Sequence, residues 1–132
     1  MGVLLNIQLA LDTKLNTLSP AVATAWPNTH YKPTENTSWM RPTLMPARSQ
    51  EATLAGAIYH QGIYQVDIFV PLEKGVAALM AIEDNIYTLF KSAVLTKNTS
   101  TIRIDVISRG PTSREEAWYR GIIEIEFSCF DA

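Results

Sequence analysis

The chain has 132 residues, of which 47% are hydrophobic and 18% charged, and its formal net charge is −2 at neutral pH. These values are typical of one globular domain, which we place over residues 1–132. The slightly acidic balance argues against a generally basic nucleic-acid-binding protein. Cys129 is the only cysteine in the sequence, which excludes an intramolecular disulfide and a cysteine metal cluster.

The apolar start of the chain does not match a secretory signal. It lacks a basic beginning, and Asn6, Gln8 and Asp12 interrupt the apolar run. No apolar run approaches the length of a membrane span. We therefore expect the protein to act inside a cell, or in a particle assembled there, without a membrane partner.

The first predicted element is a helix over residues 3–18. Its apolar residues recur at helical spacing and form one stripe: Leu4, Ile7, Leu11, Leu15 and Leu18. Ser19-Pro20 ends the helix, because proline disfavours a helical conformation in the residue before it.

Residues 21–38 predict less regular structure, with a short strand or extended edge segment followed by a loop. Residues 39–48 have an extended pattern, but Pro42 and Pro46 exclude a fully paired central strand. They fit either an edge strand or one arm of a projecting hairpin, whose tip would lie over residues 49–56.

The stretch from Gly62 to Phe90 predicts a strand, a turn and a helix. Tyr64, Val66, Ile68 and Val70 alternate with polar residues, so they would share one face of a strand over residues 57–70. Phe69 is the exception to this alternation. Gly62 suggests a bulge or bend, and Pro71 ends the strand because it has no amide to donate.

A second helix is predicted after this strand, again from apolar residues at helical spacing. They are Val76, Leu79, Ile82, Ile86, Leu89 and Phe90. Glu83, Asp84 and Lys91 would lie on the opposite, solvated side. The nearest partner for the apolar side is the apolar face of the preceding strand.

The last third of the chain predicts two antiparallel strands. Ile102, Ile104 and Val106 alternate with Arg103 and Asp105 in the first. Residues 109–116 form a connector, and residues 118–130 form the last strand, with Tyr119, Ile123, Ile125, Phe127 and Cys129 on one face.

Together these elements predict an α+β fold. We expect a mixed or antiparallel sheet of four to five strands, two helices packed on one face, and a projecting β-hairpin arm.

The sequence contains no recognisable reaction centre. His30 and His60 are thirty residues apart and lack the spacing of metal ligands. Glu124 and Glu126 share a strand face, and a solvated face explains them better than a catalytic pair. We therefore predict no catalytic residue, no cofactor and no metal site.

Aromatic and basic residues on the extended segments are the candidates for a partner surface. Trp39, Tyr59, Tyr64 and Trp118 fit either core packing or a protein–protein surface, where Trp and Tyr are enriched. Arg41 and Arg48 flank the prolines, where they are either solvated or contact an acidic partner. These six residues form the predicted subunit or partner interface.

In this order, the elements resemble the tail-terminator-like proteins of long-tailed bacteriophages, the lambda tail-terminator group and its relatives. The resemblance spans nearly the whole chain and rests on four pieces: Ile7–Leu18 followed by Ala25-Trp26-Pro27; Arg41–Arg48; Gly62–Val66 with Pro71 and Gly75; and Trp118–Phe127.

The resemblance implies a virion structural protein of the phage tail, and no enzyme. Such a protein forms a ring, typically a hexamer, that caps the tail tube, stops its polymerisation and presents a surface for joining the head. The implied partners are copies of itself, the tail tube protein and a head–tail connector protein. Sequence-specific nucleic-acid binding is not expected, although genomic DNA could pass through the ring.

The implied location is the virion tail, with the bacterial host cytoplasm during assembly. Two alternatives stay open. One is another head–tail connector or tail completion protein, and the other is a small ligand-binding α+β domain or enzyme.

Overall fold

The computed structural model describes residues 2–47, 50–51, 58–73, 75–98 and 100–131. Two helices and eight strands follow one another along this part of the chain. Their bounds are α1 Val3–Leu15, β1 Ala23–Thr24, β2 Trp39–Pro46, β3 Gln50–Glu51, β4 Ile58–Pro71, α2 Gly75–Phe90, β5 Val94–Lys97, β6 Ser100–Arg109, β7 Ser113–Glu115 and β8 Trp118–Asp131.

The strands form one curled sheet in the order β1-β2-β4-β8-β6-β5, with β3 pairing to β4 and β7 pairing to β8. Only β1 and β2 run parallel among the described pairs. This mixed α+β architecture agrees with the prediction. The sheet has eight strands where four to five were predicted, because short strands such as β1, β3 and β7 carry too few residues for a recognisable alternation.

The longest ladder of the sheet joins β4 to β8, from Ile58 opposite Asp131 to Pro71 opposite Trp118. Its register runs without a shift, so every second residue of both strands faces the same side. That side of the two strands carries mostly buried apolar residues: Tyr64, Val66, Ile68, Val70, Ile123, Ile125, Phe127 and Cys129. The predicted alternation of both strands is therefore confirmed.

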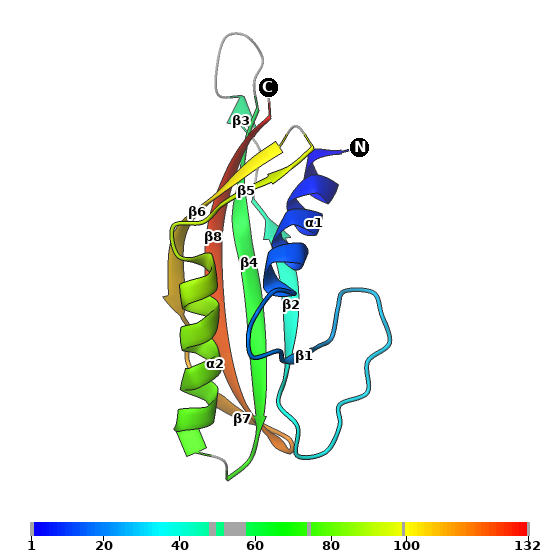
Figure 1. Ribbon diagram of the computed structural model, residues 1–132, viewed down its shortest axis with the longest axis vertical. Helices are drawn as coiled ribbons and strands as arrows, with labels where there is room; N and C mark the ends of the chain where they lie inside the picture. Colours follow the sequence, from blue (N-terminus) through cyan, green and yellow to red (C-terminus); the bar gives the residue numbers. More distant parts are fainter. Residues whose placement is uncertain (1, 48–49, 52–57, 74, 99, 132) are drawn as a thin grey trace.

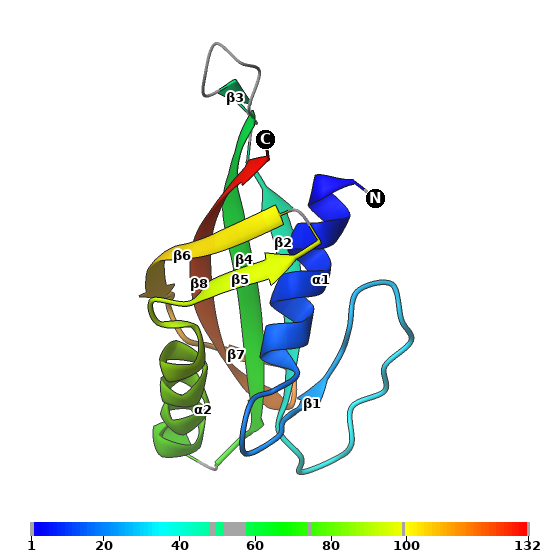
Figure 2. The same cartoon turned by 45° about the horizontal axis from the view of Figure 1, so that its top comes forward.

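Both helices contribute to the same core as this sheet face. In Figures 1 and 2 they lie in front of the sheet, with α2 on one side and α1 on the other. α1 contacts β5 and β6, α2 contacts β4, β8 and β6, and the two helices also contact each other. The helix residues in the core are Ile7, Ala10, Leu11, Leu15, Leu79, Ile86 and Phe90.

Helix α1 differs from the prediction at both of its ends. It ends at Leu15 rather than at residue 18, although Leu18 is still buried. Leu4, which was expected in the buried stripe, is 48% exposed. Asn6 is buried instead, where its side chain donates to Ser100 Oγ at 3.1 Å and accepts from Asn98 Nδ2 at 2.9 Å. These bonds satisfy a polar group that the periodicity alone would place in solvent.

Helix α2 spans the predicted residues but is rotated relative to the predicted stripe. Val76 is exposed and Glu83 is buried, although the sequence pattern placed them on the opposite sides. Gly121 explains the difference. A Cβ at Gly121 would lie 2.8 Å from the methyl groups of Leu79 and 3.0 Å from Glu83 Oε2. The helix therefore packs closest to β8 where no side chain stands between them.

Strand β6 contains an irregularity that the alternating pattern did not reveal. Its register against β8 shifts between Ile104 and Val106, which leaves Asp105 as the extra residue of a bulge. Val106 is consequently exposed, and Ile107 packs against the core in its place. The prediction of Val106 on the buried face was wrong for this reason.

Residues 41–46 do not project as an arm. They belong to β2, which pairs with β4 from Trp39 opposite Phe69 to Pro46 opposite Gly62. β1 covers only the first two residues of β2, so the rest of β2 is the predicted edge strand. Most of the predicted hairpin tip, at residues 49 and 52–56, lies outside the described residues.

Gly62 was predicted to mark a bulge or a bend, and the structure excludes the bulge, because β4 keeps its register through this position on both sides. The glycine instead permits a close approach of the neighbouring strands. A Cβ at Gly62 would lie 2.6 Å from the carbonyl oxygen of Met45 and 2.9 Å from the ring of Phe127.

We predict that Gly62→Ala lowers the free energy of unfolding by about 1–3 kcal/mol, because the added methyl group overlaps β2 backbone that cannot move away cheaply. Urea unfolding measures the change. Gly2→Ala is the matched control, since nothing lies within 4 Å of a Cβ there. Equal stability of the two variants would show that β2 and β4 are not packed this closely.

The buried side chain of Glu83 predicts how the stability of the fold depends on pH. Burial raises its pKa, an effect strengthened by the nearby Asp84 and opposed by Arg109. As the pH rises past the ordinary glutamate pKa of about 4.3, the unfolded state therefore releases this proton while the folded state still holds it. Stability falls as the pH rises above that value. Glu83→Gln removes this penalty, so its gain in unfolding free energy over wild type should grow from about pH 4 to pH 7.

Urea unfolding at both ends of this pH range tests the expectation, and Glu126→Gln controls for the loss of an exposed carboxylate. A gain from Glu83→Gln that stays the same at both pH values would contradict the burial of this side chain.

Candidate functional site

The face of the sheet opposite the helices carries an aromatic cluster near one end. Trp39 stacks on Phe69 with ring centroids 4.1 Å apart and an angle of 11° between the ring planes. Trp118 meets Trp39 edge-on at 6.0 Å, and Tyr31 lies 5.4 Å from it. The cluster joins β2, β4 and β8 through rings that are distant in sequence.

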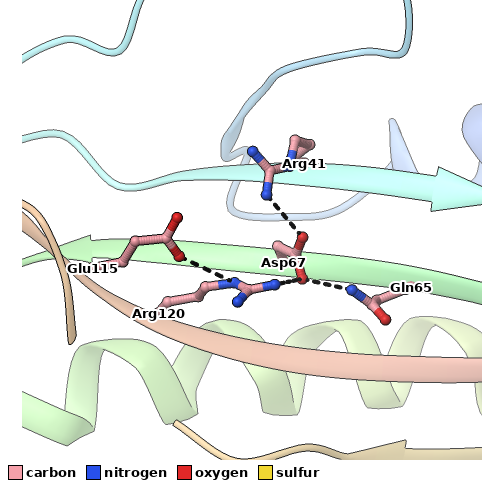
Figure 3. A network of polar contacts seen from close by, with 5 residues as sticks. All are labelled: Arg41, Gln65, Asp67, Glu115 and Arg120. Atoms are coloured by element: carbon pink, nitrogen blue, oxygen red, sulfur yellow. Dashed lines mark hydrogen bonds and ion pairs between the residues drawn. The ribbon is translucent and has the colours of Figure 1, made fainter. Parts of the chain in front are cut away.

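A polar network adjoins these rings on the same face (Figure 3). Asp67, from the middle of β4, accepts hydrogen bonds from Arg41 Nη2 at 3.2 Å and from Arg120 Nη2 at 3.0 Å. Gln65 Nε2 also donates to this carboxylate, at 3.0 Å. Arg120 Nε lies 3.6 Å from Glu115 Oε2 on β7. One carboxylate thus connects three neighbouring strands, and Arg120 extends the network to a fourth.

The two arginines around Asp67 differ in their exposure. The Asp67 side chain is only 4% exposed, and that of Arg120 is 24% exposed. Arg41 is 45% exposed, and its guanidinium also lies over the ring of Phe69, 5.3 Å from the centroid. A guanidinium has five N–H donors, so Arg41 keeps donors for a further acceptor. It is therefore a basic group of this face that can contact a partner.

Trp39 is a buried residue with a hydrogen-bond donor that is unpaired among the described residues. The residue is 8% exposed, and its indole Nε1 has no partner among the described residues. Buried N–H groups are normally paired, because leaving one unpaired costs about 1–3 kcal/mol.

Two adjoining hollows lie between α1, the segment from Ala25 to Pro33, and β2. The first measures about 460 Å³ and includes Tyr31, Trp39 and Arg41 in its lining. The second measures about 430 Å³ and is lined by α1 residues such as Asp12 and Asn16. Gln8, Trp26 and Pro27 border both hollows. We call the two hollows together the β2 groove.

The free edge of β2 beside this groove is poorly suited to accept another strand. Met40 directs its carbonyl oxygen outward, where Ala25 N–H donates to it at 2.8 Å. Backbone groups alternate along a strand, so Pro42, Leu44 and Pro46 also face outward. The two prolines lose no bond to β4 for this reason, and Leu44 is left as the one outward amide donor in residues 41–46. Proline is one of the known means of blunting an edge strand.

On the other side of the molecule, α2 exposes an apolar stripe. Val76, Met80 and Tyr87 are 49%, 48% and 36% exposed, and they lie within one narrow arc of the helix. Asp84 lies in the same arc and forms an ion pair with Arg109. We call these four residues the α2 stripe. Helices that carry apolar residues on all sides are usually covered, which marks this stripe as a candidate contact.

The structure brings together three of the six predicted interface residues, namely Trp39, Arg41 and Trp118. Tyr64 is fully buried under the helices, where its hydroxyl donates to Asp12, and burial together with that carboxylate raises its pKa. It offers no surface to a partner, which corrects its assignment to the interface. Arg48 and the side chain of Tyr59 lie outside the described residues.

Sequence reasoning missed Asp67, Arg120 and the α2 stripe. Phe69 was a usable signal, since it interrupts the polar side of β4, and an interruption of this kind marks an apolar patch on the outer face. Asp67 and Arg120 carry no such signal, because a charged residue on an outer strand face is ordinarily solvated.

Within the described ranges there is no group of three or more His, Cys, Asp or Glu side chains that could hold a metal ion. The same ranges contain no helix long and apolar enough to span a membrane.

We predict that Asp67→Ala lowers the unfolding free energy by about 1–3 kcal/mol, because it leaves two arginines without their shared acceptor. Arg41→Ala should cost less than about 1 kcal/mol, since Arg41 is half exposed and Asp67 keeps Arg120. Chemical unfolding of both variants measures which of the two loses more unfolding free energy. The opposite order would show that Asp67 does not organise the network.

Comparison with known proteins assigns the chain to a family. A search of the curated proteins finds no match. A solved structure shares the fold, with a TM-score of 0.68 and 21% identity over 97% of this chain and 92% of the other. A family model described as phage tail terminator protein matches residues 6–127. This chain therefore belongs to the phage tail terminator protein family, which comprises structural proteins of the virion tail.

Proposed function

We propose that the protein forms a closed ring, expected to be a hexamer, that caps the tail tube, stops its polymerisation and offers a surface for joining the head. Membership of the tail terminator family supports this role. The family is one of structural proteins and not of enzymes. It also favours termination over the alternatives of a general completion protein or a small ligand-binding domain.

The observation that supports a ring is the difference between the two lateral sides of the subunit. In Figures 1 and 2, α2 lies on one side of the subunit, and α1, β1 and β2 lie on the other. The exposed apolar residues of the α2 stripe belong to the first of these elements, and the β2 groove with its proline-containing edge is formed by the others. Two unlike surfaces on opposite sides of one subunit suit a heterologous contact, in which each copy meets the next head to tail. Such a contact closes into a ring when the rotation between copies permits.

The helix-free face of the sheet is our candidate for contact with the tail tube protein or the head–tail connector protein. It carries Trp39, Phe69 and Trp118 beside the half-exposed Arg41. Aromatic residues and arginine are the side chains that most often dominate binding between proteins. Assembly would take place in the host cytoplasm, and genomic DNA would pass through the completed ring.

We predict that the purified protein limits tube growth. Tail tube protein should polymerise into tubes of varied length when alone, and into shorter tubes bearing a ring at one end when this protein is added. Electron microscopy measures the tube lengths and the capped fraction. Tubes of unchanged length without terminal rings would contradict the proposed function.

Trp118→Ala tests the outer face separately, because Trp118 lies on that face and lines neither hollow of the β2 groove. If that face meets the tube, this variant should still form rings, while the fraction of capped tubes falls by about tenfold or more, as expected for the loss of a central aromatic contact. Glu126→Ala, an exposed position on the same face, is the control.

A further inference from the structure

The α2 stripe carries exposed side chains, and the β2 groove has room for them. The stripe offers two large side chains, Met80 and Tyr87, that are two helical turns apart, or about 10 Å. The groove offers two adjoining hollows separated by Trp26 and Pro27. Each hollow of about 430–460 Å³ has the size of a small ligand site, so it can receive one protruding side chain.

The charges of the two surfaces are complementary as well. Asp84 is the one charged side chain of the stripe, and its side chain is 64% exposed despite the ion pair with Arg109. The first hollow contains Arg41, which has free donors, and Trp39, whose indole N–H lacks a partner among the described residues. A carboxylate that enters this hollow would therefore find a cation.

The proline pattern of β2 decides which kind of element can occupy the groove. A strand added along residues 41–46 would find only the Leu44 amide as an outward donor. A helix makes no backbone hydrogen bonds to its partner and loses nothing at such an edge. The groove thus favours a helix that inserts side chains over a strand that extends the sheet.

From these observations we propose that the α2 stripe of one subunit docks into the β2 groove of the next copy. In this contact Met80 and Tyr87 enter the two hollows and Asp84 faces Arg41 and Trp39. The proposal rests on the proposed ring and specifies its repeating contact. Because the stripe belongs to α2 and the groove to α1, residues 25–33 and β2, one copy can use both surfaces, and each added copy leaves one stripe and one groove unpaired until the ring closes.

Cysteine cross-linking tests this contact directly. Met80→Cys and Thr29→Cys each place a thiol on an exposed residue, in the stripe and at the rim of the first hollow. The native Cys129 is buried and does not compete. Under mild oxidation on tail tubes, the mixture of the two single variants should form covalent dimers, and one chain carrying both changes should form a ladder that ends at the ring number.

Met80→Cys mixed with Glu126→Cys is the matched control, because Glu126 lies on the outer face of the sheet. Ring formation without cross-linking of the Met80–Thr29 pair would overturn the docking and leave the proposed function intact. Strong cross-linking of Met80→Cys to itself would also overturn it, since that result requires a symmetric contact. The failure of the wild-type chain to form rings on tubes would overturn both proposals.

A second measurement uses charge in place of a cross-link. Met80→Glu should lower the yield of rings by about tenfold or more, because the contact would take the added carboxylate out of water one helical turn from Asp84, whose like charge opposes it. Val94→Glu introduces the same charge at a residue of β5 that is 55% exposed and outside both surfaces, so it should assemble normally. Thermal unfolding confirms that both variants are folded. Equal ring yields for the two variants would overturn the docking.

Discussion

The uninterrupted pairing of β4 with β8 is the constraint on which the rest of the molecule depends. Fourteen residue pairs keep one register, so the two strands present a single apolar side and a single mixed side over their whole length. The apolar side determines where both helices must pack. The mixed side is left for other contacts, and the chain places its aromatic cluster and its arginines there.

The same ladder explains why Asp67 can be buried without a large penalty. The carboxylate has β2 on one side and β8 on the other, and each of these strands supplies one arginine. A buried charge is tolerated only when it is paired and hydrogen-bonded, and three donors meet that condition. The network joins the edge strand β2 to the centre of the sheet, and it holds Arg41 over Phe69 at the surface. Stability and a possible binding surface are thus provided by the same residues.

The two lateral sides of the subunit have different physical origins. On the side with α2, Gly121 leaves room for Leu79 and the buried Glu83 against β8, and Val76 is exposed to solvent. The side with β2 is hollowed because β1 covers only two residues of the strand. The prolines then keep that edge from being used as a sheet. A structural protein of the phage tail has to assemble with its neighbours in a defined way, and two unlike sides provide direction.

The amino-acid sequence by itself determined the class of fold, the location of both helices and the faces of β4 and β8, because these follow from local periodicity. It also indicated the family and pointed to Trp39, Arg41 and Trp118. Only the tertiary structure decided the burial of Glu83, the bulge at Asp105 and the role of Asp67. Each of these depends on a residue from a distant element: Gly121 for Glu83, Phe127 opposite the bulge, and Arg41 with Arg120 for Asp67. Periodicity describes a segment in isolation, whereas burial and pairing are properties of two segments that the fold brings into contact.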